Sequence, residues 1–249
     1  MKNLLSLILV LVAVLIITKW PASLESNVGS SMQSSMPTVS ANSVQSAVPP
    51  IISEPMISMP PVFGNRKSVE AGENYEYNEA LGSVTGYVNG QKREPYASFK
   101  YGTGYMKENG CGVIAVHNAL VAVGKGKELR DVALYFEDNG AILGGVFGTD
   151  PTAAVAYFES NGCAVETIYD AQEFDDVASS SVVSVLTFWN TDSIFDGAHT
   201  VALVKNANGS INVYNYYGSS GVAERFGSIS AMLEDMGHVA ICMLGVQLQ

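Results

Sequence analysis

Basic residues are scarce in this chain of 249 residues. Lysine and arginine together number 13 against 24 aspartates and glutamates, which gives a formal net charge of -11 and an isoelectric point near 4.6. Proteins that bind nucleic acid draw much of their affinity from clustered Lys and Arg side chains that contact phosphates. The sequence contains no such cluster, and this argues against a nucleic-acid partner.

Cysteine and histidine are also few, with three of each. An odd number of cysteines cannot all pair, so a small disulfide-stapled scaffold is not expected and at least one thiol is free. No CxxC or HxxxH spacing occurs, and the Gly144-Gly145 pair lacks the lysine of a phosphate-binding loop. The sequence therefore predicts neither a metal site nor a bound cofactor.

The N-terminus carries a long apolar run, from Leu4 to Ile17. Lys2 precedes it and Lys19-Trp20 closes it, a pattern typical of an export element. The run is shorter than the roughly 20 residues that span a bilayer, which favours a signal peptide, whereas the lack of a small-x-small cleavage motif favours an uncleaved anchor. Residues 1–20 are therefore predicted to be a signal peptide or an N-terminal membrane anchor. The rest of the chain would be extracytoplasmic, either secreted or attached to the cell membrane.

Residues 21–70 are rich in Ser, Pro and Met and show no sustained period of apolar residues. This composition predicts a disordered linker or a pro-segment. The folded domain is expected over residues 71–249. Its first feature is a strand-like piece from Gly82 to Val88, followed by a turn at Asn89-Gly90.

Three helices are predicted in the first half of that domain. Apolar residues recur at three- and four-residue spacing after Cys111, so a helix begins at this cysteine and ends before Gly124. Similar patterns predict helices over 128–139 and 151–160, the second with Asp150 as its N-cap.

The apolar period changes to two after residue 162, and this period predicts strands. The strands are expected at 163–169, 182–189, 199–205, 211–216 and 239–246, with a hairpin turn at 206–209 and a short helix over 228–236. Helices followed by strands indicate an α+β fold, in which an N-terminal helical lobe packs on a C-terminal antiparallel β-sheet. The junction between the two parts is the natural place for a cleft.

Cys111 lies between Gly110 and Gly112 at the predicted start of a helix. Unsatisfied backbone N–H groups and the positive end of the helix dipole favour the thiolate there, which is the nucleophilic form. The same N–H groups are suited to hold the oxyanion of a tetrahedral intermediate. Cys111 is therefore the candidate nucleophile, whereas Cys163 and Cys242 lie in apolar strand patterns typical of core thiols.

His199 and Asn215 are the candidate partners of this thiol. His199 begins a predicted strand after a polar loop, where an imidazole can face a cleft and act as a base. Asn215 lies on the next strand of the hairpin, and its side-chain amide is expected to accept a hydrogen bond from the imidazole and fix its tautomer. The other two histidines, His117 and His238, and the rival Asn212 beside the turn are expected to be structural.

This order of residues resembles the papain-like cysteine peptidases, in which a Cys-Gly begins a helix, a His begins a strand and an Asn follows on the next strand. Among these it resembles the bacterial C39-like peptidases, which trim bacteriocin leaders. The resemblance covers about residues 95–249 and depends on the segments from Asn109 to Leu120 and from Ala198 to Gly218. It implies a papain-like fold and hydrolysis of peptide bonds by the three candidate residues, without a cofactor.

One position departs from that family pattern. Such peptidases commonly carry a Gln about six residues before the Cys as a second oxyanion donor. Tyr105 occupies that position here. The hydroxyl of Tyr105 and the amide of Asn109 are the candidates to replace it.

The sequence thus predicts an exported or membrane-anchored cysteine peptidase that acts on a peptide or protein substrate. Two alternatives stay open. The first is a papain-like binding module with weak catalysis, which the missing Gln suggests. The second is an acyltransferase of the transglutaminase type, which shares the order of Cys, His and an acid or amide. Thiol reactivity separates the first alternative from a peptidase, and product analysis with an added amine separates the second.

Overall fold

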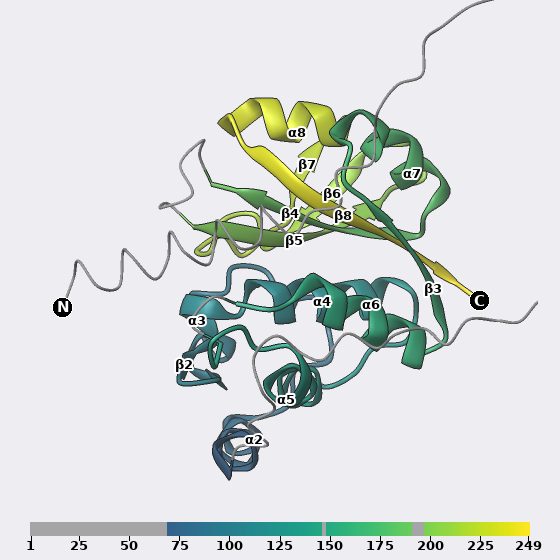
Figure 1. Ribbon diagram of the computed structural model, residues 1–249. Helices are drawn as coiled ribbons and strands as arrows, with labels where there is room; N and C mark the ends of the chain where they lie inside the picture. Colours follow the sequence, from purple (N-terminus) through teal and green to yellow (C-terminus); the bar gives the residue numbers. More distant parts are fainter. Residues whose placement is uncertain (1–68, 146–147, 191–196) are drawn as a thin grey trace, which may run out of the picture. The chain divides into compact units, whose positions relative to one another are not determined.

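The computed structural model describes residues 69–145, 148–190 and 197–249 (Figure 1). The predicted signal peptide or anchor and nearly all of the predicted linker lie outside these residues. The first described element is helix α2 (Val69–Leu81), so the last two residues assigned to the linker belong to a helix. Within the described ranges, none of the helices has the length and apolar character needed to cross a membrane.

A six-stranded antiparallel sheet has the strand order β3-β8-β4-β5-β6-β7. The five predicted strands are confirmed, although β6 ends at Tyr214 rather than at residue 216. The sequence pattern does not predict β7, because three residues carry too little alternation. A separate small sheet pairs β1 (Lys100–Tyr101) with β2 (Gly104–Tyr105). The strands of the large sheet are β3 (Cys163–Ile168), β4 (Val183–Trp189), β5 (Ala198–Lys205), β6 (Ile211–Tyr214), β7 (Glu224–Phe226) and β8 (Val239–Leu248).

Helices cover both faces of this sheet (Figure 1). On one face α4 lies against β4 and β5, with α5 and α6 packed beside it, while α7 and α8 lie on the opposite face. All four predicted helices are confirmed, and Asp150 accepts the N–H of Thr152 as the expected N-cap. The α+β fold class, with the helix that begins at Cys111 packed on an antiparallel sheet, is confirmed as well. The remaining elements are η1 (Tyr96–Ser98), α3 (Met106–Asn109), α4 (Cys111–Ala122), α5 (Leu129–Asn139), α6 (Pro151–Ser160), η2 (Ala171–Glu173), α7 (Phe174–Ser180) and α8 (Ile229–Met236).

Two apolar cores lie on the two sides of the sheet. Side chains alternate between the faces of a strand, so Val183 and Val185 of β4 join the core that contains α4, while Leu186 and Phe188 join the other core. Helix α4 is buried from Gly112 to Leu120. This burial fixes the helix, and therefore its first residue, against β5.

The segment before η1 differs from the prediction. The sequence predicts a strand from Gly82 to Val88, and this prediction is wrong because no strand forms there. Side chains of α4 hold the segment instead. The Asn118 amide accepts from the N–H of Val88 at 2.8 Å and donates to its carbonyl at 2.9 Å, and His117 Nε2 donates to the carbonyl of Gly86 at 2.8 Å. These side chains satisfy backbone groups that a neighbouring strand would otherwise pair with.

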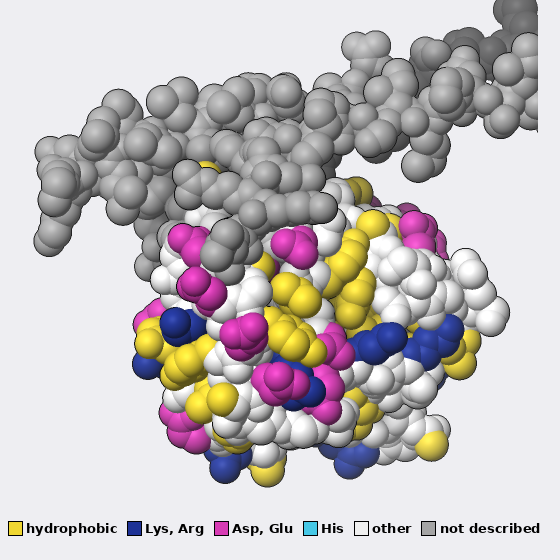
Figure 2. All heavy atoms as spheres, turned by 90° about the horizontal axis from the view of Figure 1, so that it is seen from below, with side chains coloured by type: hydrophobic (Ala, Val, Ile, Leu, Met, Phe, Trp, Pro, Cys, Tyr) yellow, Lys and Arg dark blue, Asp and Glu magenta, His cyan; other side chains and the backbone are white. Residues whose placement is uncertain are grey.

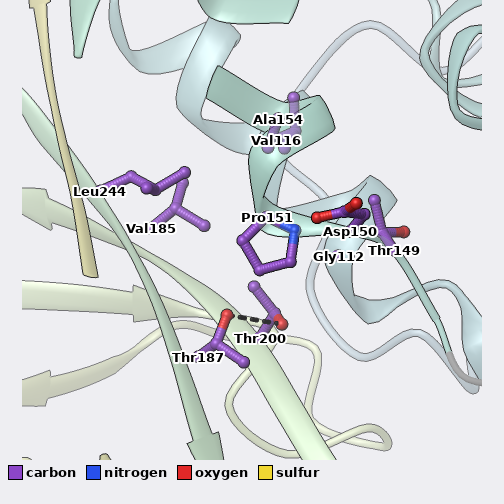
Figure 3. A pocket seen from close by; sticks show the side chains of 10 residues that line it. All are labelled: Gly112, Val116, Thr149, Asp150, Pro151, Ala154, Val185, Thr187, Thr200 and Leu244. Atoms are coloured by element: carbon purple, nitrogen blue, oxygen red, sulfur yellow. Dashed lines mark hydrogen bonds between the residues drawn. The ribbon is translucent and has the colours of Figure 1, made fainter. Parts of the chain in front are cut away.

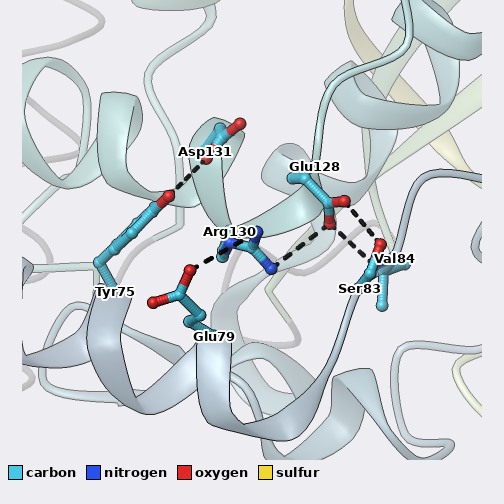
Figure 4. A network of polar contacts seen from close by, with 7 residues as sticks. All are labelled: Tyr75, Glu79, Ser83, Val84, Glu128, Arg130 and Asp131. Atoms are coloured by element: carbon cyan, nitrogen blue, oxygen red, sulfur yellow. Dashed lines mark hydrogen bonds and ion pairs between the residues drawn. The ribbon is translucent and has the colours of Figure 1, made fainter.

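Helix α2 is attached through polar contacts (Figure 4). The hydroxyl of Tyr75 donates to Asp131 at 3.1 Å, and the guanidinium of Arg130 lies 3.9 Å from Glu79 and 3.6 Å from Glu128. A helix held in this way needs no apolar stripe along one side. Its sequence therefore carries no periodic signal, and for that reason α2 is missed by the sequence analysis.

The close packing at Gly112 generates a stability prediction. A Cβ at Gly112 would lie 2.7 Å from the Cβ of Thr149, whereas a Cβ at Gly72 in α2 would meet nothing within 4 Å. We expect Gly112→Ala to lower the free energy of unfolding by about 1–3 kcal/mol through overpacking. The matched control Gly72→Ala should raise it by up to about 1 kcal/mol, because alanine favours a helix. Urea unfolding of both variants measures the difference, and equal effects would contradict the packing argument.

Candidate active site

Cys111 is the first residue of α4, a helix of 12 residues that follows the turn at Gly110. Its side chain is partly exposed, whereas Cys163 and Cys242 are buried, as expected of core thiols. The main chains of Gly112 and Thr200 lie near the Cys111 thiol and lower its pKa. The thiol thus lies among N–H groups that favour an anion.

His199 lies against this thiol because β5, which carries it, packs on α4. Burial raises the pKa of the Cys111 thiol, but the hydrogen bond and charge of His199, together with the neighbouring N–H groups, lower that pKa overall. Burial lowers the pKa of His199, but the hydrogen bond and charge of Cys111 and the carbonyl of Asn215 raise it overall. These opposite shifts favour a thiolate beside an imidazolium.

Asn215 contacts His199 through its main chain. Its carbonyl oxygen accepts a hydrogen bond from His199 Nε2 at 2.6 Å, while its side-chain amide pairs with Gln91. The expected bond between this amide and the imidazole is therefore wrong. The reason is that β6 ends at Tyr214 and Asn215 has a φ of 63°, in the left-handed region. This conformation turns the carbonyl toward the imidazole and the amide toward the segment that contains Gln91.

The carbonyl of Asn215 determines the tautomer of His199. A carbonyl oxygen only accepts hydrogen bonds, so the proton of the neutral imidazole must be on Nε2. Nδ1 is then the nitrogen left to receive the thiol proton of Cys111. A side-chain amide would not have imposed this choice as strictly, because it offers both a donor and an acceptor.

The two predicted oxyanion donors have other neighbours. The ring of Tyr105 is 5.1 Å from the ammonium group of Lys107, and the Tyr105 side chain is 38% exposed. The amide of Asn109 lies against Gly104 in β2. The groups that lower the pKa of the Cys111 thiol are instead those of His199, Thr200 and Gly112. An oxyanion role for Tyr105 or Asn109 therefore stays a prediction.

Aromatic rings lie beside His199. Phe188 meets its imidazole edge-on with ring centroids 5.8 Å apart, and the ring of His238 lies tilted against Phe188 with centroids 4.3 Å apart. Burial lowers the pKa of His238, and the charge of His199 adds to that shift. His238 is thus a neutral neighbour at pH 7. Within the described residues, no group of three or more His, Cys, Asp or Glu side chains is placed to bind a metal ion.

A small cavity lies beside the start of α4 (Figure 3). Gly112 and Thr200, which follow Cys111 and His199 in the chain, line it, and the hydroxyls of Thr200 and Thr187 are 3.1 Å apart at its wall. Its volume is about 20 Å³, enough for a single water molecule. The apolar part of its lining comes from Val116, Pro151, Ala154, Val185 and Leu244.

Charge is mixed on the surface shown in Figure 2. Acidic side chains and Lys and Arg side chains are interspersed there with hydrophobic ones.

Neither a scan against family models nor a search of the curated proteins gave a match. Among solved structures, the chain is similar to the peptidase domain of Streptococcus ComA, a bifunctional ABC transporter involved in quorum sensing, with 10% identity and a TM-score of 0.43 over 60% of this chain and 97% of that one. It is also similar to a double glycine motif protease from an AMS/PCAT transporter, with 13% identity and a TM-score of 0.40 over 67% of this chain and 99% of that one. Both neighbours are peptidases, in keeping with the resemblance to C39-like peptidases.

The geometry of the pair generates a prediction about thiol reactivity. In the full chain we expect iodoacetamide to alkylate Cys111 at pH 6 faster than a free thiol, whose pKa is about 8.5. His199→Ala removes the hydrogen bond and charge that lower the pKa of Cys111 and leaves the burial that raises it. The rate at pH 6 should therefore fall by about tenfold or more.

Mass spectrometry can read this alkylation at each cysteine separately. Cys163 and Cys242 are internal controls, because burial raises the pKa of both thiols. Both should stay unmodified until the protein is unfolded. A Cys111 that reacts no faster than a model thiol would contradict the presence of an activated pair.

Proposed function

We propose that this protein is a cysteine peptidase with Cys111 as nucleophile and His199 as its acid and base. The observation that carries the proposal is the contact between a thiol at the start of α4 and an imidazole on β5, with their pKa values shifted in opposite directions. A buried structural cysteine would not need a basic partner or N–H groups directed at its sulfur.

The mechanism follows from these groups. The Cys111 thiolate attacks the carbonyl carbon of a peptide bond, and free N–H groups at the start of α4 stabilise the oxyanion that forms. The imidazolium of His199 donates its proton to the leaving amine, which departs as the C–N bond breaks. His199, now neutral, takes a proton from water, and the water oxygen attacks the thioester to release the acid and regenerate the thiol.

The substrate we propose is a peptide or protein segment outside the cytoplasm. The basis is the N-terminal apolar run, which has the flanks of an export element. As a signal peptide it would yield a secreted enzyme, and as an anchor it would hold the enzyme at the membrane. The mechanism proposed here uses no cofactor.

Cleavage of a quenched fluorescent peptide library by the full chain tests the proposal. Cys111→Ser should lower the rate by at least about 10³-fold, and His199→Ala by about 10²- to 10⁴-fold, because each removes a group that reacts. Both variants should keep the far-ultraviolet circular dichroism of the wild type. Cleavage that survives in Cys111→Ser would exclude this site as its source.

The pH dependence of cleavage gives a second check on the same pair. As pH rises, the rate should increase while Cys111 ionises, below the ordinary pKa of a thiol, because the pKa of this group is lowered. It should decrease again as His199 loses its proton, above the ordinary pKa of a histidine, because that pKa is raised. Products formed with an added amine would instead indicate acyl transfer, and an unreactive Cys111 would indicate a binding module.

A further inference from the structure

We propose that Gln91 is a positioning residue for His199, because it holds Asn215 in the conformation that presents its main-chain carbonyl to the imidazole. The inference rests on the proposed function only in taking the Cys111–His199 pair to be the reacting pair. Nothing in the sequence pattern around Gln91 indicates this role, since the residue lies in a predicted turn region far from the other site residues.

Gln91 and Asn215 form a reciprocal pair. The main-chain N–H of Gln91 donates to Asn215 Oδ1 at 2.8 Å, and Asn215 Nδ2 donates to Gln91 Oε1 at 2.9 Å. The two residues are 124 positions apart in sequence and are 7% and 1% exposed. Buried amides with matched donors and acceptors hold one geometry, because any rotation leaves polar atoms unsatisfied.

The backbone of Asn215 needs this support. Its φ of 63° is unfavourable for most residues with a Cβ, and Asn is among the few that tolerate it. Its N–H donates to Asn89 Oδ1 at 3.1 Å, so the segment that contains Gln91 binds the main chain of Asn215 as well as its side chain. The carbonyl of the same residue is the acceptor for His199 Nε2.

Gln91 also reaches the thiol side of the site. Its Nε2 donates to the carbonyl of Lys107 at 3.1 Å, in α3, the short helix directly before α4. Next to it, the N–H of Lys92 donates to the carbonyl of Gly218 at 2.7 Å. One buried amide therefore connects the segment before Cys111 with the segment that orients His199.

The test compares Cys111 alkylation across pH in the wild-type full chain and in Gln91→Met, which has a side chain of similar length but no amide. We expect the pH midpoint of alkylation to rise and the rate at pH 6 to fall about fivefold to tenfold, the effect of losing one oriented hydrogen bond on the imidazolium. Gln172→Met is the matched control, because Gln172 is exposed in η2, and it should leave the profile unchanged.

Other titratable groups near the pair do not contribute to the pH midpoint of Cys111 alkylation. The pKa of Tyr101 is raised, chiefly by burial and partly by the charge of Cys111, and that of His238 is lowered, chiefly by burial. Tyr101 therefore stays protonated where a thiol ordinarily ionises, and His238 loses its proton below the ordinary pKa of a histidine. The pH midpoint of alkylation thus reports on Cys111 and His199.

Asn215→Gly provides an independent variant, because glycine adopts the left-handed φ and keeps the carbonyl but lacks the amide that pairs with Gln91. It should shift the profile in the same direction as Gln91→Met. The double variant should shift it no further than the larger single effect, because Gln91 acts through Asn215.

An unchanged profile in either single variant, with or without a lower melting temperature, would overturn the inference and leave Gln91 a structural residue. Additive shifts in the double variant would overturn it too. Alkylation needs no substrate, so the outcome is separable from that of the proposed function. Coupled shifts without peptide cleavage would reject the peptidase alone, whereas cleavage with an unchanged profile in Gln91→Met would reject this inference alone.

Discussion

The hydrogen bond from His199 Nε2 to the carbonyl of Asn215 is the contact on which the rest of the site depends. It fixes the imidazole proton on Nε2 and leaves Nδ1 for the thiol. The imidazolium and the thiolate then stabilise each other, and this accounts for the opposite pKa shifts of the two groups. One backbone group thus orients the imidazole, and it adds to the rise in the His199 pKa that the hydrogen bond and charge of Cys111 chiefly cause.

Regular elements on both sides support that contact. Helix α4 is buried along most of its length, so Cys111 at its first position has a fixed place. β5 provides His199 and, one residue later, Thr200, whose main chain also lowers the pKa of the thiol. Antiparallel pairing of β5 with β6 brings Tyr214 opposite Ala202, so the chain leaves the sheet near His199. A site built on such elements holds its geometry better than one built on loops alone.

Apolar periodicity predicted the parts of the fold whose side chains face a core. The helix at Cys111, the strand at His199 and the hairpin that brings Asn215 close to it could all be derived in this way. Periodicity could not predict α2, which polar contacts attach, or the segment from residue 82 to 88, which Asn118 and His117 hold. The role of Gln91 could not be predicted from periodicity either, because its pairing with Asn215 is a tertiary contact between distant segments.

The expected and the observed contact of Asn215 with His199 differ. A residue pattern can therefore indicate which residue lies beside the imidazole without indicating which of its groups makes the contact. Any residue at this position would offer a carbonyl, so the imidazole by itself does not require an asparagine there. The left-handed backbone favours Asn or Gly, and the amide pair with Gln91 then favours Asn; both bear on where the carbonyl lies. A Cys, His and Asn order can therefore mark residues that lie together while the Asn contacts the His through its main chain. The backbone conformation of Asn215 then decides which of its groups accepts the hydrogen bond from His199. The segment that contains Gln91 holds that conformation.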